Sequence, residues 1–302
     1  MSISVSVIVP VFNRSQPLER AVDSVLSQEG VSFELIVVDD ASTEPATSVF
    51  QKVETAGQRV LRLPRNLGPG GARNRGVAES RGEWLAFLDS DDHWLPGKLA
   101  RHLEHLRSAD LSIGQSEEIW FRSGCRVNPP KPHRISGGDL FRRSLRAVCV
   151  SSSTVMLRRS LFEWSGGFDE RMFVCEDYDL WLRISARETF EFFPEPLVVK
   201  YGGDPDQLSR ALPAMDRYRI FSVLKGLTRG CFVAPGQAEA ATVELSRKLR
   251  ILSKGSAKRG VTRAVDLCFE IERAAAQERW SVALRLAEQL IALWPCRPGQ
   301  IH

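Results

Sequence analysis

The sequence predicts an α/β fold in which helices flank a mostly parallel sheet, with a helical appendage at the C-terminus. Two observations carry this prediction. Short apolar segments of strand length alternate with segments of helical periodicity at the start of the chain, which is the pattern of parallel strands joined by right-handed crossovers. Beyond about residue 208 the strand segments cease and helical periodicity remains.

The first strand segment is apolar and β-branched, and Pro10 interrupts it. Ser15 suits the N-cap and Pro17 the first turn of the helix that follows, which ends before Gly30. A glycine-rich loop over residues 66–76 leads into a short helix. In this part of the chain we expect strands at 5–12, 33–38, 59–63 and 84–88, and a second long helix over 47–56.

The middle of the chain predicts a helix from Pro96 to about Arg107 and then a strand over 111–122. Acidic residues favour the first turn of a helix because of the helix dipole, so a further helix is expected to open at Glu176. The other expected segments are a basic loop at 128–133, a strand at 154–157, a short helix near Leu161, a turn at 166–170 and edge strands at 190–193 and 197–201.

The C-terminal appendage is expected to span 209–302 and to contain helices near 213–224, 238–252, 262–277 and 281–293. Its middle is basic. A solvated helix face explains such a stretch, and contact with anionic lipid or a lipid diphosphate is the alternative. The basic residues, opposed only by Glu244, are Arg247, Lys248, Arg250, Lys254, Lys258, Arg259 and Arg263.

Composition excludes several classes of protein. The net charge of +4 over 302 residues makes no case for nucleic-acid binding. The six cysteines show no metal-ligand spacing, which fits a reducing cytosol. No apolar run approaches the roughly 18 residues of a membrane-spanning helix, and the N-terminus lacks the charged start of a signal peptide. We expect a cytoplasmic protein with at most peripheral membrane contact.

The strand expected at 84–88 is followed at once by three aspartates, Asp89, Asp91 and Asp92. Ligands of open α/β sheets bind at the carboxyl ends of strands. Carboxylates packed this closely repel one another unless a cation joins them, and Mg²⁺ or Mn²⁺ prefers such oxygen ligands. The alternative is a solvated acidic turn in which Asp92 caps the helix that begins near Pro96.

Four stretches of the sequence form one ordered set of motifs: 9–14 (VPVFNR), 38–42 (VDDAS), 89–92 (DSDD), and 167–170 (GFDE) with 176–181 (EDYDLW). Together they resemble the family 2 glycosyltransferases, which have the GT-A fold and invert the configuration of the transferred sugar. The resemblance covers about residues 4–208. It implies a GT-A domain over 1–208, with a nucleotide-sugar-binding half at 1–107 and an acceptor-binding half at 108–208.

On the donor side the resemblance implies that the ends of the first two strands bind the nucleotide base. An Asp carboxylate can accept the N3–H of uracil, and an aromatic or proline face can pack on the ring. The loop at 66–76 is similar to a family pattern that brings an Arg near the base or phosphates. The nucleotide-sugar ligands implied are Pro10, Phe12, Asn13, Asp40, Arg73, Asp89 and Ser90.

The resemblance also assigns roles in catalysis. Asp91 is expected to hold a Mn²⁺ or Mg²⁺ ion that bridges the diphosphate, and Asp177 to act as general base. Glu176 and Trp181 are expected on the acceptor side, where charge in a helix N-terminus and core packing are the alternatives. Many relatives carry a His in the loop after the last strand, where it can complete the metal site. This loop has none; Asp204 is the candidate metal ligand in its place, and a plain turn residue is the alternative.

The sequence thus predicts an inverting, metal-dependent hexosyltransferase. It would use a nucleoside diphosphate-sugar, UDP-linked first, and a saccharide or lipid-linked hydroxyl in bacterial surface polysaccharide or glycolipid synthesis. The alternative is a degenerate protein of this fold that binds only nucleotide-sugar or a partner. A nucleotidyltransferase is disfavoured because a helix follows residues 10–14 directly. A Rossmann dehydrogenase is excluded because no GxGxxG follows the first strand.

Overall fold

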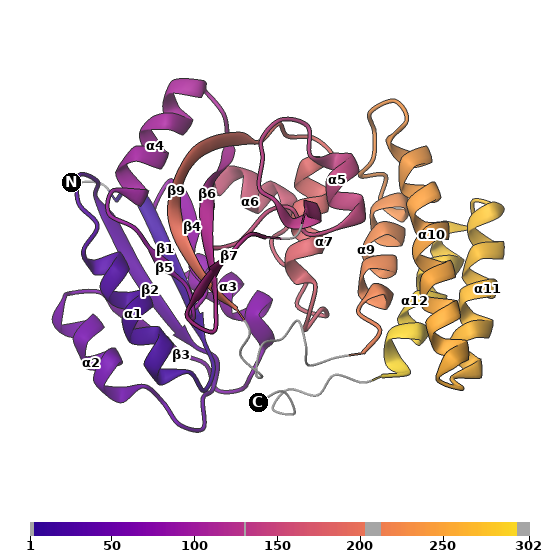
Figure 1. The fold of residues 1–302 in the computed structure, drawn as a ribbon, viewed down its shortest axis with the longest axis horizontal. Helices are drawn as coiled ribbons and strands as arrows, with labels where there is room; N and C mark the ends of the chain where they lie inside the picture. Colours follow the sequence, from indigo (N-terminus) through magenta and orange to yellow (C-terminus); the bar gives the residue numbers. More distant parts are fainter. Residues whose placement is uncertain (1–2, 130, 203–212, 295–302) are drawn as a thin grey trace.

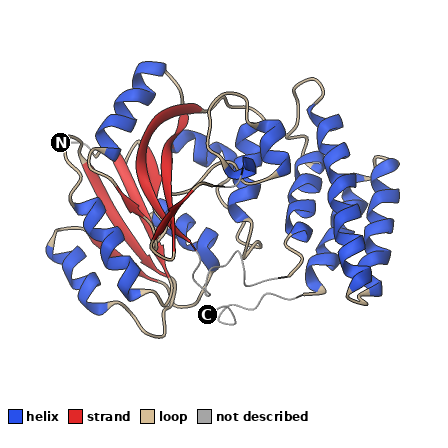
Figure 2. Ribbon diagram, in the orientation of Figure 1, coloured by secondary structure: helices blue, strands red, loops and turns tan. Residues whose placement is uncertain are grey.

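The computed structural model describes residues 3–129, 131–202 and 213–294. One sheet runs through the N-terminal two thirds, helices cover both of its faces, and four further helices stand beside this unit (Figures 1 and 2). The predicted fold class of a sheet flanked by helices with a helical appendage is therefore confirmed.

The first half of the sheet is parallel, as expected. Its strands stand in the order β3-β2-β1-β4, so the first strand of the chain lies in the middle. β1, β2 and β4 are mostly apolar and buried on both faces because helices cover both sides, whereas the edge strand β3 is partly exposed. The bounds are β1 (Val5–Val11), β2 (Phe33–Asp39), β3 (Arg59–Arg62) and β4 (Trp84–Phe87).

The second half of the sheet is mixed. β8 (Val155–Arg158) pairs antiparallel with both β4 and β6 (Ile113–Arg122), and β6 pairs parallel with β9 (Glu191–Gly202). The two edge strands expected at 190–193 and 197–201 are in fact one strand, and irregular register opposite Ser116–Glu118 interrupts its pattern. Two short strands were not foreseen: β5 (His93–Trp94) and β7 (Cys125–Val127).

Helices on the two faces of the sheet enclose separate hydrophobic clusters. On one face Leu18, Val22 and Val25 of α1 pack over β1 together with α2 and α4. The other face packs against α3, α6 and α7. The bounds are α1 (Ser15–Leu26), α2 (Thr47–Thr55), α3 (Gly68–Ala78), α4 (Lys98–Ala109), α6 (Arg159–Ser165) and α7 (Glu176–Ser185).

Ser15 is not the N-cap that we expected. It is the first residue of α1, and Arg14 occupies the cap position. α4 also starts later than expected, at Lys98, because Gly97 adopts a left-handed conformation with φ of 79° that ends the preceding turn.

The C-terminal helices form a third layer that is not a separate body. Leu224 of α9 and Leu245 of α10 share one hydrophobic cluster with Tyr178 and Leu182 of α7. The expected boundary at residue 208 lies outside the described residues. The C-terminal helices are α9 (Asp216–Thr228), α10 (Gln237–Lys258), α11 (Thr262–Ala276) and α12 (Trp280–Ala292). Two shorter elements lie earlier in the chain: the 3-10 turn η1 (Lys131–His133) and α5 (Phe141–Arg146), which the sequence did not indicate.

None of the helices in the described part of the chain combines the length and the apolar character that crossing a bilayer requires.

Candidate active site at the ends of the central strands

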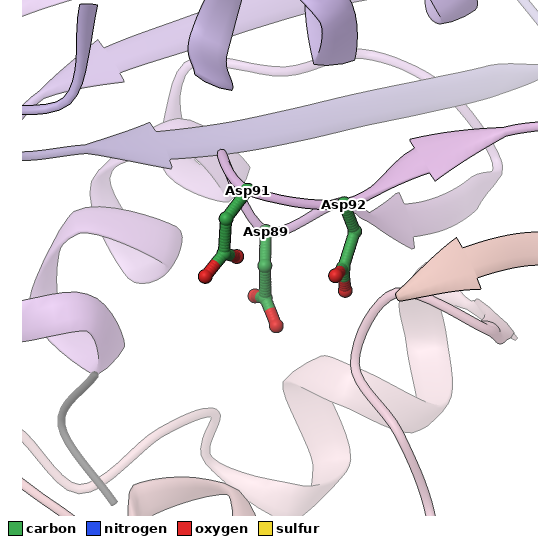
Figure 3. A group of neighbouring side chains, drawn as sticks. All are labelled: Asp89, Asp91 and Asp92. Carbon is green, nitrogen blue, oxygen red and sulfur yellow. The ribbon is translucent and has the colours of Figure 1, made fainter. Parts of the chain in front are cut away.

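The turn between β4 and β5 carries three carboxylates, which we call the acidic turn: Asp89, Asp91 and Asp92. One oxygen of each lies within 4.8 Å of the others. Figure 3 shows the three side chains projecting to the same side of the turn. β4 is a central strand, so the turn stands at the carboxyl edge of the parallel half of the sheet, where the fold places ligands.

Three basic side chains from distant parts of the chain neutralise the acidic turn. Arg14 donates to Asp91 Oδ2 at 2.6 Å. Arg73 donates to Asp89 Oδ1 at 2.7 Å. Lys200 Nζ lies 3.3 Å from Asp92 Oδ2 and 3.9 Å from Asp89 Oδ2. The turn is therefore a charged cluster in which each carboxylate has a cationic neighbour.

The carboxylates of the turn differ in proton affinity. Burial favours a raised pKa for Asp89, but Arg73 and Lys200 outweigh it, so the pKa of Asp89 is lowered. Burial is the main reason that the pKa of Asp92 is raised to about 7; Lys200 opposes this shift, and the carboxylates of Asp91 and Asp89 add to it. Asp89 is thus the better anionic ligand at neutral pH.

Asp92 does not cap a helix. Its Oδ2 accepts a hydrogen bond of 2.6 Å from Ser153 Oγ, and its Oδ1 one of 3.3 Å from the backbone of Tyr201. Because α4 begins only at Lys98, the capping alternative is wrong. The carboxyl group of Asp92 instead joins the acidic turn to β9.

Arg73 connects the acidic turn to α7. It is buried, and while one of its terminal nitrogens binds Asp89, the other donates to Glu176 Oε1 at 2.8 Å. Gly70 permits this contact, because a Cβ there would stand 3.0 Å from Glu176 Cγ. The glycine-rich stretch thereby lets α3 approach α7, which is a packing role.

The first turn of α7 places two acidic residues at the site. Burial raises the pKa of Glu176 to about 7, the charge of Asp177 adds to this, and Arg73 opposes it. Burial also raises the pKa of Asp177, while the 2.6 Å hydrogen bond from the backbone N–H of Tyr178 to Asp177 Oδ1 and the charge of Arg73 work against the shift. Glu176 is buried and bound to Arg73, whereas Asp177 is partly exposed, so Asp177 is the carboxylate of the two that a ligand can reach.

The ends of β1 and β2 form the remaining wall. Asp40 is buried, and its Oδ1 accepts a 2.7 Å hydrogen bond from the backbone of Leu67. Burial raises the pKa of Asp40 to about 7 against this hydrogen bond, and the charge of Asp39 contributes to the rise. Asn13 Oδ1 accepts a 2.9 Å hydrogen bond from the backbone of Thr43 and so holds the loop after β2.

The other predicted site residues are placed unequally. Phe12 is partly exposed beyond the end of β1, whereas Pro10 is buried inside that strand, and Ser90 is buried in the acidic turn. Trp181 packs against Phe168 in the core, with ring centroids 6.2 Å apart. The core-packing alternative therefore describes Trp181 better than acceptor contact. Asp204 lies outside the described residues.

Lys200 and Ser153 are contacts of the site that the sequence did not assign, and Arg14 appeared only as part of a motif. Lys200 is a lone cation in an otherwise apolar segment of β9, which is the one signal that pointed to it. Ser153 lies in a run of serines without any pattern.

The donor set suits a hard divalent cation. Three carboxylates within 4.8 Å supply only oxygen ligands, the chemistry that Mg²⁺ and Mn²⁺ prefer. Asp89 and Asp91 are also partly exposed, so an ion and a phosphate can reach them.

A GT-A-type glycosyltransferase is the class of protein that this fold and this acidic turn define. The family model "Glycosyl transferase family 2" matches residues 6–163, and the chain belongs to that family.

Curated relatives agree with this assignment. The succinoglycan biosynthesis protein ExoO of Rhizobium meliloti is 40% identical over 189 residues, which are 58% of this chain and 54% of ExoO. The chain thus matches about half of the length of that relative. The UDP-Glc:alpha-D-GlcNAc-diphosphoundecaprenol beta-1,3-glucosyltransferase WfaP of Escherichia coli is 28% identical over 190 residues, or 61% of this chain and 70% of WfaP.

Solved structures support the fold. TarS of S. aureus in complex with UDP superposes with a TM-score of 0.66 at 16% identity, covering 98% of this chain and 93% of TarS. The mannosyltransferase PcManGT of Pyrobaculum calidifontis, in complex with GDP-Man and Mn²⁺, gives a TM-score of 0.56 at 20% identity, covering 97% of this chain and 86% of PcManGT.

Proposed function

We propose that the chain is a metal-dependent, inverting glycosyltransferase that moves a sugar from a nucleoside diphosphate-sugar onto a hydroxyl group. One observation carries the proposal: Arg73 bridges Asp89 of the acidic turn and Glu176 of α7, so that donor-side carboxylates and the candidate base Asp177 line one site. We assign the donor half to residues 1–107 and the acceptor half to 108–208.

The substrates follow by analogy with the relatives' names. UDP or UDP-GlcNAc is bound in TarS structures, which makes a UDP-sugar the first donor to test, and GDP-Man in PcManGT keeps GDP as the second. WfaP acts on a diphosphoundecaprenol-linked sugar and ExoO serves succinoglycan biosynthesis. We therefore propose a lipid-linked saccharide as acceptor, in surface polysaccharide synthesis.

On the donor side, the ionised carboxylate of Asp40 accepts the N3–H of a uracil ring, and the partly exposed ring of Phe12 packs on the base. Arg73 faces the phosphates from beneath the acidic turn. A divalent cation held by Asp91, beside Asp89 and Asp92, would offset the negative charge that develops on the leaving diphosphate.

On the acceptor side, Asp177 takes the proton of the attacking hydroxyl on Oδ2, because Oδ1 already accepts from Tyr178. The hydroxyl oxygen forms a bond to the anomeric carbon as the bond from that carbon to the diphosphate oxygen breaks. The electron pair of the broken bond leaves with the diphosphate. One such displacement inverts the configuration, and the raised pKa of Asp177 strengthens it as a base.

Nucleotide binding tests the donor side first. UDP, GDP and dTDP are added to the protein, each with and without Mn²⁺, and the melting temperature is measured. A ligand at about 100 times its dissociation constant contributes roughly 2.7 kcal/mol, which shifts melting by roughly 2–4 °C in a chain of this size. One nucleotide that acts only with metal identifies the donor base. No metal-dependent shift with any nucleotide would favour the degenerate alternative.

The variant Asp177→Asn tests the base. It keeps the nucleotide-dependent melting shift but loses transfer by about 10²–10⁴-fold, because general base catalysis contributes that much. Glu170→Gln, which changes an exposed carboxylate that pairs with Arg75 of α3, retains transfer. Full activity of Asp177→Asn would exclude Asp177 as base.

We further propose that α10 contacts anionic membrane, which would bring the enzyme to a lipid-linked acceptor. The structure narrows the predicted basic stretch: Lys248 is buried against Arg146 and Glu244, and Arg263 is paired with Glu270. The exposed cations that support the proposal are Arg250, Lys254, Lys258 and Arg259, with exposed Val243 and Ile251 on the same helix.

Flotation with vesicles of phosphatidylglycerol or phosphatidylcholine tests this contact. The wild type is expected to float with the anionic vesicles only, and Lys254→Glu/Lys258→Glu to remain at the bottom. The control Arg279→Glu/Arg285→Glu reverses two exposed charges near and on α12 and should float like the wild type. Equal flotation of all three proteins would remove the membrane from the proposal.

A further inference from the structure

The cations around the acidic turn fall into two kinds. Arg73 is buried and held at both ends of its guanidinium group, by Asp89 and Glu176. Arg14 and Lys200 are about one fifth exposed, and they reach the turn from opposite sides, after β1 and from β9. Arg73 is therefore a fixed part of the site, whereas Arg14 and Lys200 stand where solvent and ligands have access.

Arg14 and Lys200 each pair with one oxygen of the acidic turn. Arg14 lies 2.6 Å from Asp91 Oδ2, and Lys200 lies 3.3 Å from Asp92 Oδ2. A cation that enters alone must compete with Arg14 for Asp91 and accept the like charge of Lys200 a few ångströms away. A nucleoside diphosphate changes this balance, because its phosphate oxygens are strong acceptors for Arg and Lys side chains.

We propose that Arg14 and Lys200 are resident counter-ions of the acidic turn, which move from the aspartates to the diphosphate and so make binding of the divalent cation and of the nucleotide mutually dependent. The inference rests on the proposed function and adds the two residues that couple its two ligands. Because coupling between ligands is reciprocal, each ligand raises the affinity for the other by the same factor.

The test measures free Mn²⁺ by electron paramagnetic resonance while the ion is titrated into the protein, with and without saturating UDP. In the wild type, UDP is expected to tighten Mn²⁺ binding by about tenfold or more. Lys200→Met should bind Mn²⁺ alone about tenfold more tightly than the wild type and UDP more weakly, so that the coupling falls. Arg14→Met should do the same, and it serves if Lys200→Met does not fold.

Lys52→Met is the matched control. Lys52 also pairs with two carboxylates, those of Glu19 and Asp23, but on the surface between α1 and α2. Its loss changes the net charge equally and should leave both affinities at wild-type values. A stronger affinity for Mn²⁺ in this control as well would assign the effect to net charge and overturn the proposal.

Two further outcomes are decisive. If UDP binds the wild type, yet folded Lys200→Met and Arg14→Met hold Mn²⁺ alone no better than the wild type, the counter-ion role is wrong and the proposed function stands. If UDP, GDP and dTDP all fail to bind the wild type with Mn²⁺ present, the proposed function fails, and this inference fails with it.

Discussion

Two clusters of buried acids and bases lie close together in this protein, and they have different designs. One is the acidic turn. The other, which we call the anchor cluster, joins α7 to α9: Lys225 donates to Asp179 at 2.7 Å and to Asp169 at 2.9 Å, and Arg183 and Arg171 complete it. The side chains of Asp179 and Lys225 are 0% and 2% exposed. Those of Asp89 in the acidic turn and of its neighbour Lys200 are 28% and 22% exposed.

The difference separates a structural cluster from a ligand site. In the anchor cluster Asp179 pairs with Arg183 of α7 and with Lys225 of α9, and no part of its side chain reaches solvent. In the acidic turn the carboxylates crowd one another, and the pKa of Asp92 is raised to about 7 by its burial. Ion pairing of buried acids is common to both clusters, so exposure and mutual repulsion, rather than pairing, are the features on which we propose the acidic turn as the ligand site.

The largest effect on stability is expected from Lys225→Met. Lys225→Met leaves the buried carboxylate of Asp179 with Arg183 as its one remaining cationic partner, and loss of one member of a buried ion pair costs about 3–5 kcal/mol. Urea unfolding measures this loss, and nucleotide binding by the remaining folded protein should persist. Arg171→Met is the control, because Arg171 is 57% exposed and its pair with Asp169 contributes about 1 kcal/mol or less. Similar losses of stability in both variants would mean that the buried pair of Lys225 stabilises the fold no more than the exposed pair of Arg171 does.

Asp91→Asn should do the opposite of Lys225→Met: it should reduce transfer strongly and change stability little. We expect transfer to fall roughly 100-fold or more, because stabilisation of the leaving group by a metal is worth several kcal/mol and 1.36 kcal/mol corresponds to tenfold in rate. The free energy of unfolding without metal should change by about 1 kcal/mol or less, since the pair with Arg14 is partly exposed. Steady-state rates and urea unfolding of the same preparation check both statements. A stable variant with full activity would remove Asp91 from the site.

The smallest effect on ligand binding and transfer concerns pH and Asp40, whose pKa is about 7 in the folded protein against 3.8 in the unfolded chain. The folded state therefore binds the proton more tightly, so this residue lowers the free energy of unfolding as pH rises from about 4 to 7. UDP binding should behave in the opposite way and strengthen from pH 6 to 8, because the ionised carboxylate is the acceptor that we propose for uracil. Calorimetric titration at several pH values tests this.

Asp40→Asn is the matching variant for the pH experiment. The Asn side chain cannot ionise, so UDP binding should be weak and independent of pH from 6 to 8. The free energy of unfolding should also change less between about pH 4 and 7 than it does in the wild type. The same upward trend in the variant would assign the pH dependence to another group.

The sequence by itself determined the fold class and the position of the acidic turn. The strands β1, β2 and β4 are buried on both faces, so their composition alone separates them from the helices between them. Asp89 and Asp91 follow β4 directly, and the connection rules for parallel strands bring Asp40, at the end of β2, to the same edge. Local pattern and topology were sufficient for these residues.

Only the tertiary structure decided what those residues contact. β5 has two residues, too few for any periodicity, and is a strand because β9 pairs with it. Arg14 meets Asp91 across 77 positions and Arg73 meets Glu176 across 103, and charge composition cannot select such partners. Trp181 and Lys248 are further examples, since their burial depends on α3, α5 and α7 packing around them. The physical reason is that hydrophobic periodicity is written along the chain, whereas ion pairs and burial are settled by residues that meet only after folding.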